Sequence, residues 1–339
     1  MNEPKRHHFL PVFYLKNWCN EESGKLVEFS TPFMNEIKPR RVHPKGTGYI
    51  DKLYAIEGIS GELSYAVEKN FLSPVDNKAA TACQALLSGG PVHPQDRRAW
   101  AHFIMTLLLR APREINIIKD ILRNLESGTV SGLMNFVIRH APKEFHSEAG
   151  QAFEELKKSA VSRSIEHIIE IMSNEDIVEK IVGMDWDVID LSTSTHELLT
   201  SDRPVMVERG EQTGGETAIS LPLSPKKLFV AVTNRLLIRQ LKSQNAKNIS
   251  QAVNTEIIEN ADKLAYGSSD RQLTFIKNRF GKRKRASVIE ENLNKALKIS
   301  EDLGTYLSSI DDNSMREKFL LAAKTYKDKK ESGKHEFRN

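Results

Sequence analysis

Residues 184–232 read MDWDVIDLSTSTHELLTSDRPVMVERGEQTGGETAISLPLSPKKLFVAV. Within this stretch, short segments rich in β-branched and aromatic residues are separated by turn-forming residues. These segments are 186–191, 196–200, 204–207, 219–221 and 227–232. Apolar segments of this length, each bounded by turn signals, are typical of strands joined by hairpins. The stretch therefore predicts a mostly antiparallel sheet in the middle of the chain.

Helical patterns flank this β block on both sides. The strongest covers residues 94–126, where Pro94 marks an entrance and Pro112 divides the pattern into two helices. Another helical pattern covers residues 152–182. After the block we expect helices at 250–264, 271–278 and 286–310, and a last one from 313. This order predicts a helix-rich α+β fold with a central, mostly antiparallel β block and C-terminal helices.

The composition is that of a polar globular protein. The chain has 339 residues, of which 39% are hydrophobic, and 49 Lys and Arg residues against 45 Asp and Glu residues give a net charge of +4. These values exclude collagen-like, wholly disordered and integral-membrane classes. Cys19 and Cys83 are too few for a disulfide framework, and no signal-peptide pattern follows the N-terminus. We therefore expect a cytoplasmic protein with free thiols and no membrane partner.

The N-terminal segment, residues 6–18, is unusually dense in aromatic residues and histidines: RHHFLPVFYLKNW. His7 and His8 are candidate metal ligands or acid/base groups near neutral pH. Neighbouring side chains on a strand point in different directions, so the two imidazoles are not expected to share one metal. The alternative is that the aromatic residues anchor this segment while a histidine hydrogen-bonds locally.

A second candidate is the sequence TSDRP at residues 200–204. A hydroxyl and a carboxylate in one turn, from Ser201 and Asp202, can bind a metal or phosphate, or orient a base. Asp202 can equally close an Asx-turn before Pro204, which is a common structural task.

Two helical positions are also candidates. Asn254 lies in the middle of an apolar helix face, where a buried amide needs partners and either braces a site or ties loops together. Arg110 falls in one arc with Arg98, His102 and Thr106, which suggests an anion site. A solvent-facing stripe is the alternative for this arc.

The positive charge is local. Residues 277–285 read KNRFGKRKR, with six basic residues and no acid. Such a run attracts phosphates and makes binding dependent on salt, so nucleic acid is a candidate partner. We assign that contact to its last four residues, Lys282, Arg283, Lys284 and Arg285. A solvated loop is the alternative, since charge runs usually face solvent.

The motifs together resemble one family. Their order along the chain is HHFxPxFYLxxW from residue 7, RxP from 110, TSDRPV from 200, LPLSP from 221, and Asn254 followed by NAD from 260. The chain resembles the bacterial family catalogued as domain of unknown function 4238 over about residues 6 to 268. It departs at Trp18, where the family more often has Phe, and at Arg203, where it often has Asn. The resemblance implies a shared site and no named activity, and it predicts domains at 1–268 and 269–339.

We therefore expect a pocket where the N-terminal segment meets the β block. His7 or His8 would act as base or ligand, Asp202 as its carboxylate partner and Arg110 as the anion clamp, with Asn254 bracing them. The candidate substrate-binding residues are Tyr14, Asn17, Ser201 and Asn254. Such a site suits hydrolysis of a phosphoester, including one in nucleic acid, with a divalent metal as candidate cofactor. A non-catalytic nucleic-acid- or partner-binding protein and a small-molecule sensor are the alternatives. The sequence predicts no oligomeric state.

Overall fold

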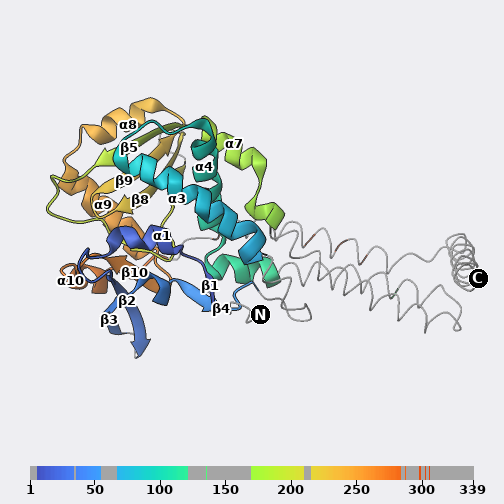
Figure 1. Cartoon of the computed structure of the whole chain (residues 1–339), viewed down its shortest axis with the longest axis horizontal. Helices are drawn as coiled ribbons and strands as arrows, with labels where there is room; N and C mark the ends of the chain where they lie inside the picture. Colours follow the sequence, from blue (N-terminus) through green and yellow to red (C-terminus); the bar gives the residue numbers. More distant parts are fainter. Residues whose placement is uncertain are drawn as a thin grey trace, which may run out of the picture. The chain divides into compact units, whose positions relative to one another are not determined.

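A computed structural model describes residues 6–33, 36–54, 67–120, 169–209 and 215–283, and single positions at 135, 287, 298, 302 and 305. The chain divides into two compact units. Figure 1 labels the helices and strands described below. The first comprises residues 1–55, 60–116 and 165–288, and the second comprises 56–59, 117–164 and 289–339. Most of the second unit lies outside the described residues, so the fold below is that of the first. The predicted domain boundary after residue 268 stays a prediction.

The central sheet is built from the predicted β block. Its four antiparallel strands lie in the order β5 (Asp185–Asp190), β9 (Lys227–Val232), β8 (Thr217–Ser224) and β7 (Met206–Arg209). Successive side chains on a strand point to opposite faces. In β9, Phe229 therefore faces one side of the sheet while Leu228 and Val230 face the other, and all three are buried. A strand that is apolar on both faces needs cover on both.

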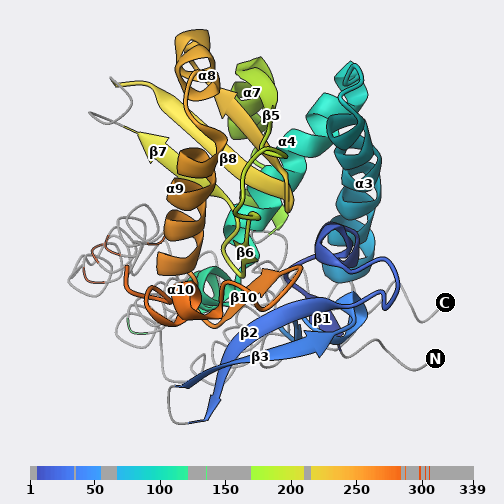
Figure 2. The same ribbon diagram turned by 90° about the vertical axis from the view of Figure 1, so that its left-hand side faces the viewer.

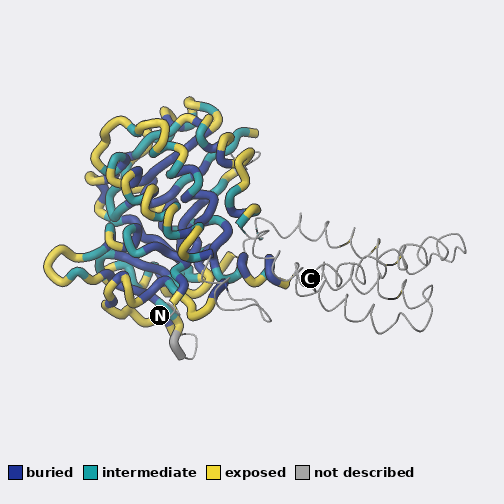
Figure 3. The backbone as a smooth tube through the Cα atoms, turned by 45° about the vertical axis from the view of Figure 1, so that its right-hand side comes forward, coloured by how far each residue is buried: buried dark blue, intermediate teal, exposed yellow. Residues whose placement is uncertain are grey.

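Helices supply that cover (Figure 2). On the Phe229 face lie α3 (Ser73–Ser88), α4 (Pro94–Leu109) and α7 (Glu175–Gly183). The ring of Trp100 in α4 meets Phe229 edge-on, with centroids 5.8 Å apart. On the other face, Val230 joins Ile238 of α8 (Arg235–Lys242) and Val253 of α9 (Ala246–Glu259) in one buried cluster. Figure 3 shows the buried backbone running through this layered core.

A second antiparallel sheet lies next to the first. Its strand order is β3 (Glu36–Val42), β2 (Leu26–Phe33), β10 (Leu264–Gly267) and β6 (Thr200–Ser201). The N-terminal segment pairs separately, as β1 (Arg6–His8) with β4 (Tyr49–Asp51), and continues into α1 (Val12–Leu15) and η1 (Lys16–Trp18). The remaining short elements are η2 (Pro44–Gly46), η3 (Val67–Leu72), a π-helical turn leading into α3, and α10 (Leu273–Lys277).

Gly48 sets the path of the N-terminal segment. Its carbonyl accepts hydrogen bonds from the backbone N–H of Phe9 at 2.9 Å and of Leu10 at 3.1 Å. Its φ is +67°, and a Cβ there would lie 3.1 Å from the Leu10 Cβ. Glycine alone combines this left-handed conformation with so close an approach.

The predicted α+β architecture is confirmed, with local corrections. Residues 196–200 do not form a full strand: only Thr200–Ser201 pair, as β6. The side chain of Asn254 hydrogen-bonds the backbone of Glu197 and Leu199 and thereby replaces a strand partner. The predicted helix over 152–182 is interrupted at Ser173 and Asn174 before α7, and its part before residue 169 lies outside the described residues. The predicted helices at 286–310 and from 313 lie outside them almost entirely. No helix in the described ranges is both long and apolar enough to cross a membrane.

Candidate functional site

The aromatic N-terminal segment is fastened to loops beside the central sheet. Tyr14 is fully buried; its hydroxyl lies 2.8 Å from the Thr200 Oγ1 and donates to the Pro222 carbonyl at 2.9 Å. The Trp18 indole N–H donates to the Leu198 carbonyl at 3.0 Å. Three stretches that are far apart in sequence are thus joined by buried hydrogen bonds, which explains why this segment needs aromatic residues with polar tips.

Asn17 also fastens the N-terminal segment to its neighbours. Its Nδ2 donates to the Leu223 carbonyl at 2.8 Å and lies 3.7 Å from the Sγ of Cys83 in α3. Burial raises the pKa of the Cys83 thiol to about 11, so the sulfur stays protonated. The polar groups of Tyr14 and Asn17, predicted to bind substrate, therefore bind backbone carbonyls in this structure.

His7 faces the interior from β1. It is buried, its ring stacks on Tyr54 with centroids 5.2 Å apart, and its Nδ1 accepts the backbone N–H of Tyr54 at 3.2 Å. These contacts fix the position of Tyr54.

His8 points the other way, as alternation along a strand requires. It is half-buried, and the backbone of Lys45 hydrogen-bonds its ring. The Nε2 is buried and has no partner among the described residues, so that bond uses Nδ1. Burial lowers the pKa of His8, and the nearby cations of Arg110 and Arg6 lower it further. The imidazole is therefore neutral at pH 7, with Nε2 as its free acceptor.

Arg110 is the C-cap residue of α4 and lies two residues before Pro112. Its side chain is fully buried, and Nη1 donates to both carboxylate oxygens of Asp76 in α3, at 2.9 and 3.2 Å. The Nε and Nη2 are buried without an acceptor in the described structure. These two nitrogens share one edge of the guanidinium, the edge that binds two oxygens of a phosphate or carboxylate side by side.

Two further residues, not predicted from the sequence, complete this group. The Oε2 of Glu68 in η3 and the hydroxyl of Tyr54 are buried and without a partner in the described parts of the chain. The other interactions of Glu68 are with the His8 backbone, which hydrogen-bonds its carboxylate, and with the charges of Arg110 and Asp76. Burial raises the pKa of Glu68 to about 7, although the Arg110 cation opposes that rise.

We name these five residues the His8–Arg110 cluster: His8, Tyr54, Glu68, Asp76 and Arg110. The Arg110 cation shifts the pKa of each of the other four, so all four lie within range of its charge. Among the described residues the cluster contains five buried polar atoms without a partner: His8 Nε2, Tyr54 OH, Glu68 Oε2, Arg110 Nε and Arg110 Nη2. Native interiors pair nearly all such atoms, so this concentration of unpaired ones makes the cluster the candidate functional site.

A family model described as "Protein of unknown function (DUF4238)" matches residues 6–271. The chain belongs to this family. The resemblance predicted from the sequence motifs is thereby confirmed, and the matched region contains the whole His8–Arg110 cluster. No curated protein and no solved structure matches the chain.

Asp202, in the TSDRP motif of the DUF4238 region, faces a backbone loop. Its carboxylate accepts the N–H groups of Asp262 at 2.9 Å, Lys263 at 2.6 Å and Leu264 at 3.0 Å. Burial raises the pKa of Asp202 to about 6, against the effect of these three bonds. In the described ranges no hydrogen bond or ion pair joins Asp202 to either histidine. Asp202 binds the start of β10 to the end of β6.

Ser201 and Arg203, the neighbours of Asp202 in the motif, also bind groups within the protein. The Ser201 Oγ accepts the backbone N–H of Arg203 at 3.2 Å. Arg203 in turn pairs with Glu114 at 3.2 Å and with Asp262 at 3.7 Å.

Asn254, in the fifth element of the DUF4238 pattern, forms hydrogen bonds with both the oxygen and the nitrogen of its amide. Its Oδ1 accepts the Leu199 N–H at 2.8 Å, and its Nδ2 donates to the Glu197 carbonyl at 2.8 Å and to Gln272 Oε1 at 3.1 Å. The structure places it with the loop before β6 and does not bring it into contact with the His8–Arg110 cluster.

The basic run is partly described. Arg283 pairs with Glu256 at 2.6 Å and with Glu259 at 2.8 Å, and Lys282 is exposed. Lys284 and Arg285 lie outside the described residues. The predicted nucleic-acid contact stays a prediction, and one of its four cations is already paired within the protein.

The other residues predicted to share a helix face with Arg110 make different contacts in the structure. Arg98 is on the surface and pairs with Glu175 and Glu179, while Thr106 is buried and donates to the Phe103 carbonyl at 2.9 Å. His102 lies 3.5 Å from Glu175. Among the described residues, no group of three or more His, Cys, Asp or Glu side chains is arranged to hold a metal ion.

Proposed function

We propose that the His8–Arg110 cluster binds the anionic group of a phosphoester and hydrolyses it. The observation that carries the proposal is the set of five buried polar atoms without partners in the described structure, three of which belong to His8 and Arg110. An unpaired buried donor costs about 1–3 kcal/mol, so such atoms persist where they serve a ligand or a reaction.

Arg110 supplies the anion clamp. Asp76 holds its Nη1 through two hydrogen bonds, which fixes the plane of the guanidinium. The free Nε and Nη2 edge is left to bind two oxygens of the phosphoryl group. The Tyr54 hydroxyl, fixed from behind by the stacking of His7, supplies a further donor. Fixed donors aimed at developing negative charge are the usual means of stabilising such a transition state.

His8 and Glu68 supply the proton transfers. Neutral His8 accepts a proton from water at Nε2, and the water oxygen forms a bond to phosphorus. The ester P–O bond breaks, and protonated Glu68 delivers its proton to the leaving oxygen. A base that is neutral and an acid whose pKa is about 7 are both in the required state near neutral pH.

The other predicted site residues have positioning roles in this proposal. Tyr14 and Asn17 hold the segment that follows β1, and Ser201, Asp202 and Asn254 hold the loops around β6. Their hydrogen bonds support this assignment, because each of these side chains binds neighbouring backbone groups.

Hydrolysis of p-nitrophenyl phosphate and of bis(p-nitrophenyl) phosphate by the full chain tests the proposal, with and without Mg²⁺ or Mn²⁺. We expect turnover of at least one ester and a loss of about 100-fold or more in kcat/KM in His8→Gln. His93→Gln, at an exposed histidine, is the matched control. Absence of turnover under all conditions, or an equal effect of both substitutions, contradicts hydrolysis at this cluster. Saturable phosphate binding without turnover would instead favour the sensor alternative.

A further inference from the structure

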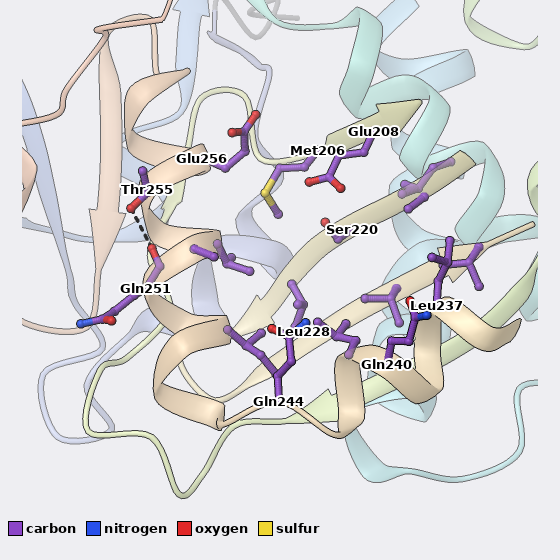
Figure 4. A pocket seen from close by; sticks show the side chains of 18 of the residues that line it. Met206, Glu208, Ser220, Leu228, Leu237, Gln240, Gln244, Gln251, Thr255 and Glu256 are labelled. Atoms are coloured by element: carbon purple, nitrogen blue, oxygen red, sulfur yellow. Dashed lines mark hydrogen bonds between the residues drawn. The ribbon is translucent and has the colours of Figure 1, made fainter. Parts of the chain in front are cut away.

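A second candidate site lies on the face of the central sheet opposite to the one that α3 and α4 cover. A cavity of about 850 Å³ opens between the strands β7, β8 and β9 and the helices α8 and α9. Figure 4 shows Met206 and Ser220 on the strands facing Leu237 and Gln244 from the α8 side. We call this cavity the α8–α9 groove. Its volume falls within the range of about 300–1,000 Å³ that is typical of small-molecule sites.

The groove has an apolar floor and a polar rim. Met206, Val230 and Val253 line the floor and belong to the main buried cluster. Gln240 and Gln244 line the rim. An apolar floor combined with a few polar groups at the margin suits a ligand with an aliphatic body and one polar end.

The charged residues of the lining differ in whether they are paired. Glu256 is held by Arg283 at 2.6 Å and by the amide of Asn260 at 2.9 Å. Arg279 is half-buried, and its guanidinium lies 4.4 Å from the centre of the Phe275 ring. In the described ranges Arg279 has no ion pair. The stacking on Phe275 fixes this uncompensated cation at the groove, where it can bind an anion.

Glu208 is the other lining charge without an ion pair in the described structure. It lies on the edge strand β7 and is exposed, so water solvates its carboxylate. The half-buried Arg279 gains more from a counter-ion than the exposed Glu208 does, because a charge that has lost part of its water interacts more strongly with a partner.

We propose that the α8–α9 groove binds a small amphipathic carboxylate, with its aliphatic part on the Met206 and Val230 floor and its carboxylate on Arg279. The groove contains no residue of the His8–Arg110 cluster, so this inference does not depend on the proposed hydrolysis. The two sites can be tested separately on the same protein.

Isothermal titration of the full chain with decanoate, below its micelle concentration, tests the groove. Decanol and decyltrimethylammonium are the neutral and cationic probes with the same chain length. We expect decanoate to bind best and Arg279→Gln to weaken its binding about 2- to 5-fold, the range of a solvent-accessible ion pair. Arg271→Gln, at an exposed arginine outside the lining, should leave binding unchanged.

A second variant tests whether the ligand occupies the groove without changing any charge. Ser220→Phe places a large side chain in the groove from β8 and should abolish decanoate binding, while circular dichroism verifies the fold. Failure of decanoate to bind, equal affinity for decanol, tighter binding of the cationic probe, or unchanged binding in Arg279→Gln or in folded Ser220→Phe would each overturn the proposal.

Discussion

Arg110 donates two hydrogen bonds from one nitrogen to Asp76, at 2.9 and 3.2 Å, while its Nε and Nη2 have no acceptor in the described structure. A fully buried guanidinium normally satisfies more of its five donors. Asp76 therefore orients the guanidinium but does not satisfy all of its donors. The Nε and Nη2 edge is available to an oxyanion.

Asp76→Ala tests how much the folded state depends on this pair. It leaves the buried Arg110 charge without compensation, and we expect the free energy of unfolding to fall by about 3–5 kcal/mol. Urea denaturation gives the measurement. Glu36→Ala, which removes exposed ion pairs with Lys38 and Lys277, should cost no more than about 1 kcal/mol. Equal losses in the two variants would show that Arg110 does not need Asp76.

Tyr14→Phe tests the joint between the N-terminal segment and the central sheet. The substitution removes the hydroxyl that bonds Thr200 and the Pro222 carbonyl, and both partners are buried. We expect a loss of about 1–3 kcal/mol in the free energy of unfolding. Tyr49→Phe, at a half-buried position in β4, is the control. A Tyr14→Phe protein as stable as the control would mean that apolar packing alone holds the segment.

Asp202→Asn tests whether Asp202 holds the backbone in place or takes part in phosphate binding. An amide cannot accept from all three backbone N–H groups that the carboxylate binds, because its NH₂ group faces donors. We expect destabilisation by at least about 2 kcal/mol, and phosphate affinity unchanged in the folded fraction. Asp270→Asn, at an exposed carboxylate, serves as reference. A stable Asp202→Asn protein that has lost phosphate binding would return Asp202 to the site.

Stability should depend on pH through Glu68. Its pKa of about 7 in the folded state exceeds the ordinary value of 4.5, so the folded protein binds a proton that the unfolded chain has released between these values. The resulting stabilisation is fully present below pH 4.5 and is lost as the pH rises through 7. Wild type should therefore lose stability relative to Glu68→Gln between pH 4.5 and 7. Denaturation series at several pH values measure this difference; Glu21→Gln, at an exposed glutamate, should show none. If the stability of wild type relative to Glu68→Gln stays constant or rises between pH 4.5 and 7, Glu68 does not hold a proton in the folded protein as we expect.

Sequence patterns predicted the parts of this fold that depend on local periodicity. The apolar, turn-bounded segment at 227–232 predicted β9, Pro94 marked the start of α4, and Pro112 marked the division that follows the end of α4 at Leu109. The prediction was less accurate for residues 196–200, because the amide of Asn254, more than 50 positions later, binds that backbone. Such long-range side-chain contacts have no signal in local spacing.

The candidate site divides in the same way. The motifs pointed to His8 and Arg110, which the structure brings into one cluster. Nothing in the sequence marked Glu68, whose environment is made by residues from β1, α3 and the end of α4. Asp202 was predicted beside the histidines because a carboxylate in a turn can do chemistry, but its donors come from residues 262–264, some 60 positions away in the sequence.

The most direct test of the account is calorimetric titration of the full chain with inorganic phosphate at pH 7. Arg110→Lys keeps the positive charge beside Asp76 but lacks the two-nitrogen edge, and Arg98→Lys makes the same change at an exposed arginine. The account predicts saturable binding by wild type and Arg98→Lys and at least about a tenfold weaker affinity in Arg110→Lys. Equal affinity in all three proteins, or no binding by wild type, would contradict it.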